Sequence, residues 1–149
     1  MATYVPAPTV ENIAKSLINR YTHNLGELNV EKIGFLWEID TEPKTKLAVT
    51  KKVDSALKIY YSEKDYIIIF YQKLWDTLVP AQQHILVFHE LLHCEPLGEK
   101  LRDHDIKDFY EIGGTFGINW ASNPLVQDPL YKDKIDIVVK PINYASDDD

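Results

Sequence analysis

The stretch VFHELLHC, residues 87–94, carries two histidines four positions apart, His89 and His93, with Glu90 directly after the first. In an α-helix, residues four apart lie on one face about one turn apart, so both imidazoles can reach one ion. Glu90 projects about 100° away from His89 around the helix, which suits a carboxylate that contacts water rather than the ion. The pattern is HExxH, for which zinc is the usual cation. The competing interpretation is an apolar helix that carries two ordinary histidines.

The surroundings of the motif favour the zinc interpretation. Apolar side chains fill the positions before and between the histidines, which predicts a buried helix: Ile85, Leu86, Val87, Phe88, Leu91 and Leu92. A histidine inside such a helix needs a polar partner, because an unpaired polar group is costly to bury. Pro80 suits the first turn of this helix, which we expect to extend to about residue 95.

Two segments before the motif predict β-strands. DYIIIFY, residues 65–71, is continuous and β-branched, as in a strand buried on both faces. IGFLWEI, residues 33–39, is short, apolar and aromatic. LAVTKKV, residues 47–53, is compatible with either a strand or a short helix. The predicted fold class is therefore α+β, with a short, mostly antiparallel sheet packed on the HExxH helix and two further helices.

The two further helices flank the predicted sheet and motif in the sequence. One is expected over residues 10–23, where apolar residues recur at helical spacing after Thr9, a suitable cap. The other is expected over residues 104–119, with Asp103 as its cap. A loop at residues 96–103, which contains proline and glycine, separates it from the motif.

The ends of the chain are expected to add little to the core. Residues 1–8 include two prolines and predict an extended lead-in, and residues 121–149 form a C-terminal extension with an acidic tail. Within that extension, IDIVV, residues 135–139, is a candidate strand. No internal repeat or linker divides the sequence, so we expect one domain over residues 1–149.

Composition narrows the class of function. A formal net charge of -7 argues against nucleic acid as a partner, because such proteins neutralise phosphates with basic residues. Cys94 is the one cysteine, so no intrachain disulfide can form, which suits a reducing compartment. We find neither a secretory signal nor an apolar run long enough to cross a bilayer, so no membrane contact is expected. A cytoplasmic location is the resulting expectation.

A catalytic zinc site takes three protein ligands and leaves one position open. His104 follows a loop long enough to reverse the chain, and a neutral imidazole suits zinc, so we predict His89, His93 and His104 as the ligands. Glu111 is the alternative third ligand and would give a site of two histidines and one glutamate. In either case Glu90 is the predicted general base.

Two aspartates near His104 are candidates for supporting a ligand rather than binding the ion. Asp108 lies one turn after His104 in the predicted helix, and we expect its carboxylate to accept a hydrogen bond from an imidazole N–H and so fix the tautomer of that imidazole. Asp105 is the alternative for that role.

The segment HELLHCEPLGEKLRDHDIKDFYEIGGTFGINW, residues 89–120, resembles the phage metallopeptidase family. It combines an HELxH helix, a short polar loop, an H-D-x-x-D-F motif and a G-x-x-W ending. The resemblance to this family covers about residues 25–120. The segment is also similar in outline to SprT-like proteases, although it lacks the cysteine-rich zinc ribbon that many of those carry.

The resemblance implies a small zincin-like domain with zinc as cofactor. The implied activity is hydrolysis of a peptide or protein substrate, including a host protein, by a metal-activated water in the host cytoplasm. In proteases of this build the substrate pairs along a sheet edge, which residues 66–70 or 33–38 are expected to provide. The alternative is a phage factor that binds a host protein on a zincin scaffold, with a structural or inactive zinc site. The oligomeric state stays open.

Overall fold

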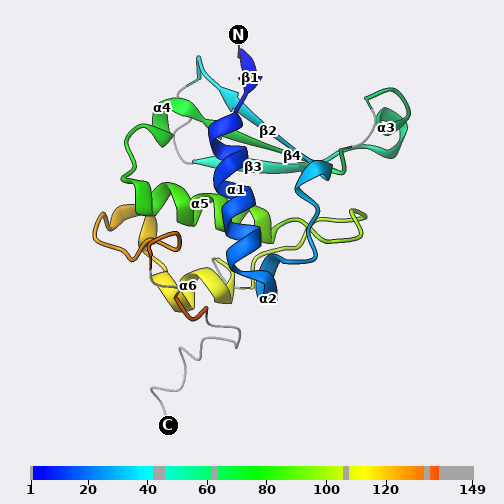
Figure 1. Cartoon of the computed structure of the whole chain (residues 1–149). Helices are drawn as coiled ribbons and strands as arrows, with labels where there is room; N and C mark the ends of the chain where they lie inside the picture. The colour runs from blue at the N-terminus through cyan, green and yellow to red at the C-terminus, as the bar shows by residue number, and fades with distance from the viewer. Residues whose placement is uncertain (1, 42–45, 62–63, 106–107, 133–134, 138–149) are drawn as a thin grey trace.

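The fold is α+β, as the sequence predicts, in the computed structural model of the chain (Figure 1). The structure describes residues 2–41, 46–61, 64–105, 108–132 and 135–137. Its strands are β1 (Tyr4–Pro6), β2 (Ile33–Glu38), β3 (Ala48–Lys52) and β4 (Tyr66–Tyr71). Its helices are α1 (Pro8–Arg20), α2 (Thr22–Leu25), α3 (Ser55–Tyr61), α4 (Gln72–Trp75), α5 (Pro80–Leu92) and α6 (Tyr110–Phe116), with 3₁₀ helices η1 (Val30–Lys32) and η2 (Trp120–Ser122).

The sheet is mixed, in the order β1-β2-β4-β3. β2 and β4 run parallel at its centre, and β1 and β3 pair with them antiparallel on the outside. The central position explains the continuous apolar run in β4, whose Ile68 and Phe70 are fully buried. The expectation that residues 33–38 or 66–70 form a free edge is wrong, because β1 and β3 flank these segments. The edges of the sheet are β1 and β3.

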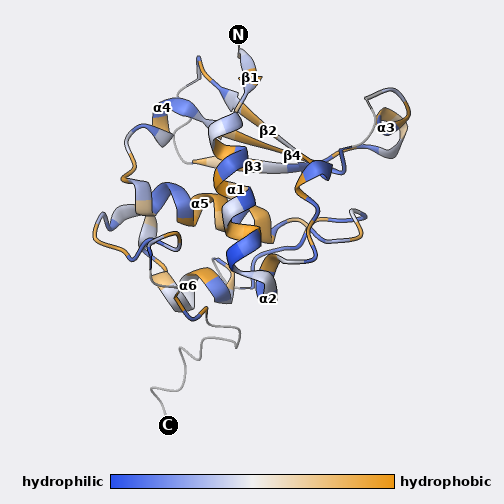
Figure 2. Cartoon of the chain, in the orientation of Figure 1, coloured by the Kyte–Doolittle hydropathy of each residue, from blue (hydrophilic) through white to orange (hydrophobic). Residues whose placement is uncertain are grey.

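α5 is the central helix of the core and contacts α1, α6 and β3. Its residues Ile85, Val87, Phe88 and Leu91 are fully buried. Figure 2 shows hydrophobic residues on β2, β4 and the C-terminal half of α5, which is the half that carries the HExxH motif. Close packing on several sides therefore fixes the direction in which the motif side chains project.

The first elements begin earlier than predicted. The lead-in is not merely extended, because its residues form β1 at the sheet edge. α1 begins at Pro8, and the N-cap is Ala7 rather than Thr9. Proline suits the first helical position because its missing N–H would have no partner there. The helix ends at Arg20, short of the predicted residue 23, and α2 follows.

Other segments differ from expectation in smaller ways. The ambiguous segment at residues 47–53 is a strand, β3, and the following helix α3 has no predicted counterpart. Residues 135–137 are not in a strand, and the rest of the predicted strand at 135–139 lies outside the described residues. No helix in the described ranges is long and apolar enough to cross a membrane.

The predicted helix over residues 104–119 is wrong at both ends. α6 spans seven residues and begins at Tyr110, with Phe109 rather than Asp103 at its N-cap. The described residues before it are irregular, and the Asp105 carboxylate accepts a hydrogen bond from the Tyr110 N–H at 3.0 Å. Gly117, at φ 93°, ends the helix in a conformation that other residues rarely adopt.

Candidate metal centre

The C-terminal end of α5 places His89 and His93 on one face. The helix ends at Leu92, earlier than the predicted residue 95, but His93 keeps the right-handed helical conformation at the C-cap. The four-residue spacing therefore still brings both imidazoles to the same side of the helix. Their ring centroids are 5.2 Å apart.

His104 reaches this pair from the irregular segment after α5. Its Nε2 atom lies 3.0 Å from Nε2 of His89 and 3.0 Å from Nε2 of His93. Three nitrogens that bind one zinc ion tetrahedrally, each at about 2.05 Å, are about 3.3 Å apart. The three imidazoles therefore form a cluster that can hold one metal ion, with separations slightly shorter than the bound distances.

The hydrogen-bonding partners of the other ring nitrogens identify the tautomers. Nδ1 of His93 lies 2.8 Å from the carbonyl oxygen of Arg102, which can only accept, so Nδ1 carries the proton. Nδ1 of His89 lies 2.7 Å from Oδ1 of Asp108, and in the described part of the chain it has no other partner. A neutral ring with a protonated Nδ1 has its lone pair on Nε2. Both lone pairs therefore face the cluster, as metal binding requires.

The charge states of the rings fit the same function. Burial, together with the neighbouring imidazoles of His89 and His104, lowers the pKa of His93 to about 4. Burial and the adjacent His89 also lower the pKa of His104. Burial alone would lower the pKa of His89, but the Asp108 and Glu90 carboxylates outweigh it and raise that pKa. At neutral pH, His93 and His104 are thus in the neutral form that binds metals.

Asp108 is held in place by two donors in addition to His89. Its Oδ1 accepts from the Phe109 N–H at 2.7 Å, and its Oδ2 accepts from the indole Nε1 of Trp120 at 2.8 Å. Burial would raise the pKa of Asp108, but the bonds from His89, Trp120 and Phe109 outweigh it and lower that pKa. The carboxylate is therefore a charged, well-oriented partner for His89.

Glu90 lies beside the imidazole cluster and is 4% exposed. Its Oε1 accepts a hydrogen bond from the hydroxyl of Thr50 at 2.7 Å, and its Oε2 lies 3.7 Å from Nε2 of His89. Burial raises the pKa of this carboxyl group. One oxygen is thus fixed by β3, and the other remains available on the side of the cluster.

Asp105 and Glu111 lie away from the imidazole cluster, where both carboxylates pair with Arg102. The guanidinium donates to both oxygens of Glu111, at 2.9 and 3.0 Å, and to Oδ2 of Asp105 at 2.9 Å. It also lies over the ring of Phe109, 4.5 Å from the centroid. The structure therefore brings neither carboxylate into the imidazole cluster. Instead they anchor the residue whose carbonyl oxygen faces His93.

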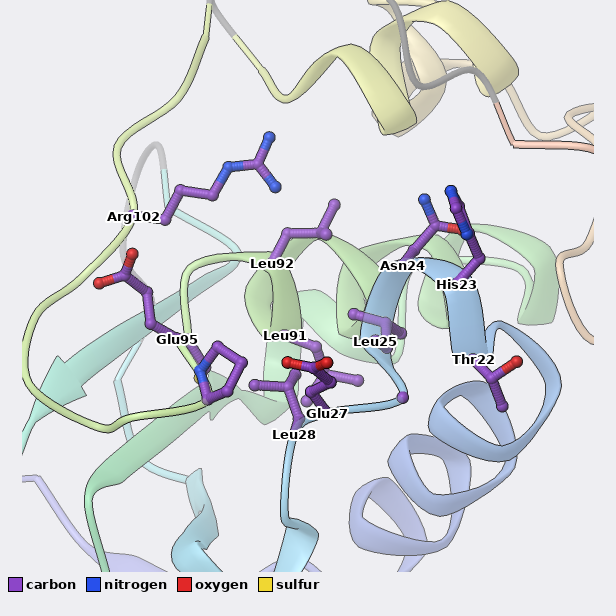
Figure 3. Close-up of a pocket in the computed structure, with 13 residues that line it drawn as sticks. Thr22, His23, Asn24, Leu25, Glu27, Leu28, Leu91, Leu92, Glu95 and Arg102 are labelled. Carbon is purple, nitrogen blue, oxygen red and sulfur yellow. The ribbon is translucent and has the colours of Figure 1, made fainter.

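A pocket of about 440 Å³ lies next to this segment (Figure 3). Its walls come from α2 and the following turn on one side and from the end of α5 and the chain after it on the other, with Arg102 among the lining residues. Neither the three histidines nor Glu90 line it. The pocket is thus separate from the imidazole cluster.

Among the described residues, four contact the site although they were not predicted to do so: Thr50, Arg102, Phe109 and Trp120. Trp120 is 12 positions from its partner Asp108, and Thr50 is 40 positions from Glu90. Contacts over such separations depend on how the elements pack, so no local sequence pattern indicates them. The short motif G-x-x-W that ends at Trp120 is the one sequence signal, and it does not indicate the hydrogen bond.

Comparison with known proteins agrees with the geometry. The model of a family described as Putative phage metallopeptidase matches residues 2–130, which extends the predicted coverage of residues 25–120 at both ends. Comparison with curated proteins and with solved structures gives no match. Because the family model covers most of the 149 residues, the chain belongs to the putative phage metallopeptidase family.

Proposed function

We propose that the protein is a zinc-dependent peptidase in which His89, His93 and His104 hold the ion and Glu90 is the general base. The observation that carries this proposal is the convergence of three imidazole Nε2 atoms beside a buried carboxylate, 3.7 Å from the nearest of them. Three neutral nitrogen ligands are a typical donor set for catalytic zinc and leave a position free.

The residues divide the chemistry among them. When bound, zinc supplies Lewis acidity, which activates water and polarises a peptide carbonyl group. Oε2 of Glu90 takes the proton from the attacking water and then delivers it to the leaving amine. Asp108 and the Arg102 carbonyl keep the Nδ1 protons of His89 and His93 in place, so that both Nε2 lone pairs stay directed at the ion.

A substrate strand can pair along the edge of β3. The bonds that flank this strand, Tyr71 N–H to Leu47 O at 3.3 Å and Val53 N–H to Asp65 O at 2.8 Å, show which residues face β4. Because the direction alternates along an antiparallel ladder, the N–H and C=O groups of Ala48, Thr50 and Lys52 point to the other side. No strand in the described part of the chain pairs with these groups, which lie near Glu90, so an extended peptide can add a strand there.

Metal analysis tests the ligand set. We expect about one zinc per purified chain, loss of zinc in His104→Ala, and retention of zinc in Glu90→Gln. The exposed His23 supplies a matched control, because His23→Ala removes an imidazole outside the cluster and should keep the metal. Equal zinc content in the wild type and His104→Ala would exclude His104 as a ligand.

Hydrolysis tests the peptidase activity separately. The wild type should cleave an unfolded protein such as fluorescently labelled casein, and Glu90→Gln should lose about 100-fold or more of that rate. If both proteins bind zinc but behave identically towards casein and towards host-cell proteins, the zinc site is structural, and the alternative of a host-protein-binding factor gains support.

A further inference from the structure

We infer that Thr50 is a positioning residue that orients Glu90 and links this orientation to the strand edge where substrate pairs. The inference rests on the proposed peptidase function and adds a role for a residue outside the HExxH motif. Thr50 in β3 donates a hydrogen bond to Glu90 in α5.

Among the described residues, both hydrogen-bond contacts of the Thr50 hydroxyl are with Glu90. The hydroxyl lies 2.7 Å from Oε1 and 3.3 Å from the Glu90 carbonyl oxygen. The hydroxyl has one proton, so the shorter contact with the carboxylate is the hydrogen bond that it donates. Thr50 is 8% exposed and Glu90 is 4% exposed, so water competes little for either group. A hydrogen bond to a buried carboxylate is among the stronger ones in proteins.

Packing alone does not account for a threonine at this position. The side chains of Ala48, Thr50 and Lys52 lie on the same face of β3, because side chains alternate along a strand. Of these, Thr50 is the buried one, and valine would fill the same volume without a hydroxyl. The hydroxyl is therefore explained by its carboxylate partner rather than by its size.

The hydrogen bond selects one oxygen of Glu90 for chemistry. A glutamate side chain has three rotatable bonds, so a buried carboxylate without a partner can take several positions. Thr50 holds Oε1, which leaves Oε2 facing the cluster at 3.7 Å from Nε2 of His89. Removal of the hydroxyl should thus change where the carboxylate lies without removing any metal ligand.

The backbone of the same residue belongs to β3, an edge strand of the described sheet. The N–H and C=O groups of Thr50 point away from β4, where a substrate strand can bind them. A β-branched side chain has restricted χ1, so the position of its hydroxyl follows the position of the backbone. Pairing of a substrate with β3 therefore steadies the same residue that holds the general base.

Structures of the zinc-loaded wild type, Thr50→Val and Thr50→Ser give a test that does not need activity. We expect Glu90 in one conformation in the wild type and in Thr50→Ser, and displaced or in several conformations in Thr50→Val. Zinc content should be equal in all three proteins. Thr50→Ala provides a second hydroxyl-free variant in case valine disturbs folding. An unchanged Glu90 position in both hydroxyl-free variants would overturn the inference.

Kinetics on labelled casein then separates positioning from binding. Thr50→Val should lower kcat about ten-fold or more with KM nearly unchanged, because the edge backbone remains. Thr50→Ser should stay within about two-fold of the wild type, which a loss of packing would not predict. If Glu90 moves in Thr50→Val but the wild type cleaves nothing, the proposed function fails while the positioning role stands. If kcat is unchanged in Thr50→Val, the positioning role fails and the peptidase activity stands.

Discussion

Replacement of Asp108 by asparagine is the sharpest test of how the site holds its ligands. In the wild type, Oδ1 faces the His89 Nδ1 proton and the Phe109 N–H, and Oδ2 faces the Trp120 indole N–H. All three partners are donors, so a carboxylate can satisfy them together. An amide has one accepting oxygen and one donating NH₂, so in either orientation it points a donor at another donor.

The size of the effect follows from the better of the two orientations. With its oxygen towards His89 and Phe109, the introduced amide keeps two contacts and faces Trp120 with a mismatched NH₂. The remaining bond to His89 also loses its charge. Loss of a carboxylate behind a ligating imidazole typically lowers metal affinity about 10–100-fold, or about 1.4–2.8 kcal/mol. We expect Asp108→Asn to fall in this range.

A double-mutant cycle with Trp120→Phe isolates the cause. Trp120→Phe alone removes one donor from Asp108 and should weaken zinc binding less than Asp108→Asn does. In the Trp120→Phe background the amide no longer meets a second donor, so the cost of Asp108→Asn should shrink. Competition with a chromophoric chelator measures all four affinities. If Asp108→Asn binds zinc within about two-fold of the wild type, Asp108 does not support His89 as argued.

Three further predictions concern the edge strand, the arginine and the ion. Ala48→Pro removes an N–H that points away from β4 and should raise the KM for casein about ten-fold without changing the free energy of unfolding. As a control, Val49→Pro removes a hydrogen bond to β4 and should lower the free energy of unfolding, measured in urea, by about 3 kcal/mol. Arg102→Lys loses the bidentate hydrogen bonds to Glu111 and should lower the free energy of unfolding by about 1–2 kcal/mol. The same variant should also bind zinc more weakly. If zinc is present at 100-fold above Kd, chelation should lower the free energy of unfolding of the wild type by about 2.7 kcal/mol, and its melting temperature by several degrees. The same treatment should leave His104→Ala unaffected. Equal chelator responses in the two proteins would contradict the ligand set.

The sequence predicts the parts of the site that depend on local geometry. His89, Glu90 and His93 lie within one helical segment, where a fixed rotation per residue determines their relative directions. The convergence of His104 could be expected because the intervening loop is long enough to reverse the chain. The pairing of Asp108 with His89 could not be derived in detail. It depends on an irregular segment where a helix was predicted.

The errors in the fold have a common physical origin. The apolar patterns of residues 33–38 and 66–70 identify strands but not their neighbours, and the structure pairs them in parallel at the centre of the sheet. The predicted helix over 104–119 fails because side-chain contacts stabilise another backbone path. Asp105 bonds the Tyr110 N–H and the Arg102 guanidinium, so α6 starts later. Tertiary contacts decided both cases, and local propensity does not contain them.

Charge balance explains why a histidine suits this site better than a carboxylate as the third ligand. Asp108 and Glu90 are 5% and 4% exposed, and both carboxylates lie against His89. Two buried anions are costly unless positive charge lies close to them, and imidazoles in the neutral, metal-binding form supply none. A divalent cation in the cluster offsets both. A glutamate such as Glu111 as third ligand would leave an excess negative charge beside Glu90, the proposed general base, and would oppose its ionisation. In the structure that carboxylate instead pairs with Arg102, where its charge is matched.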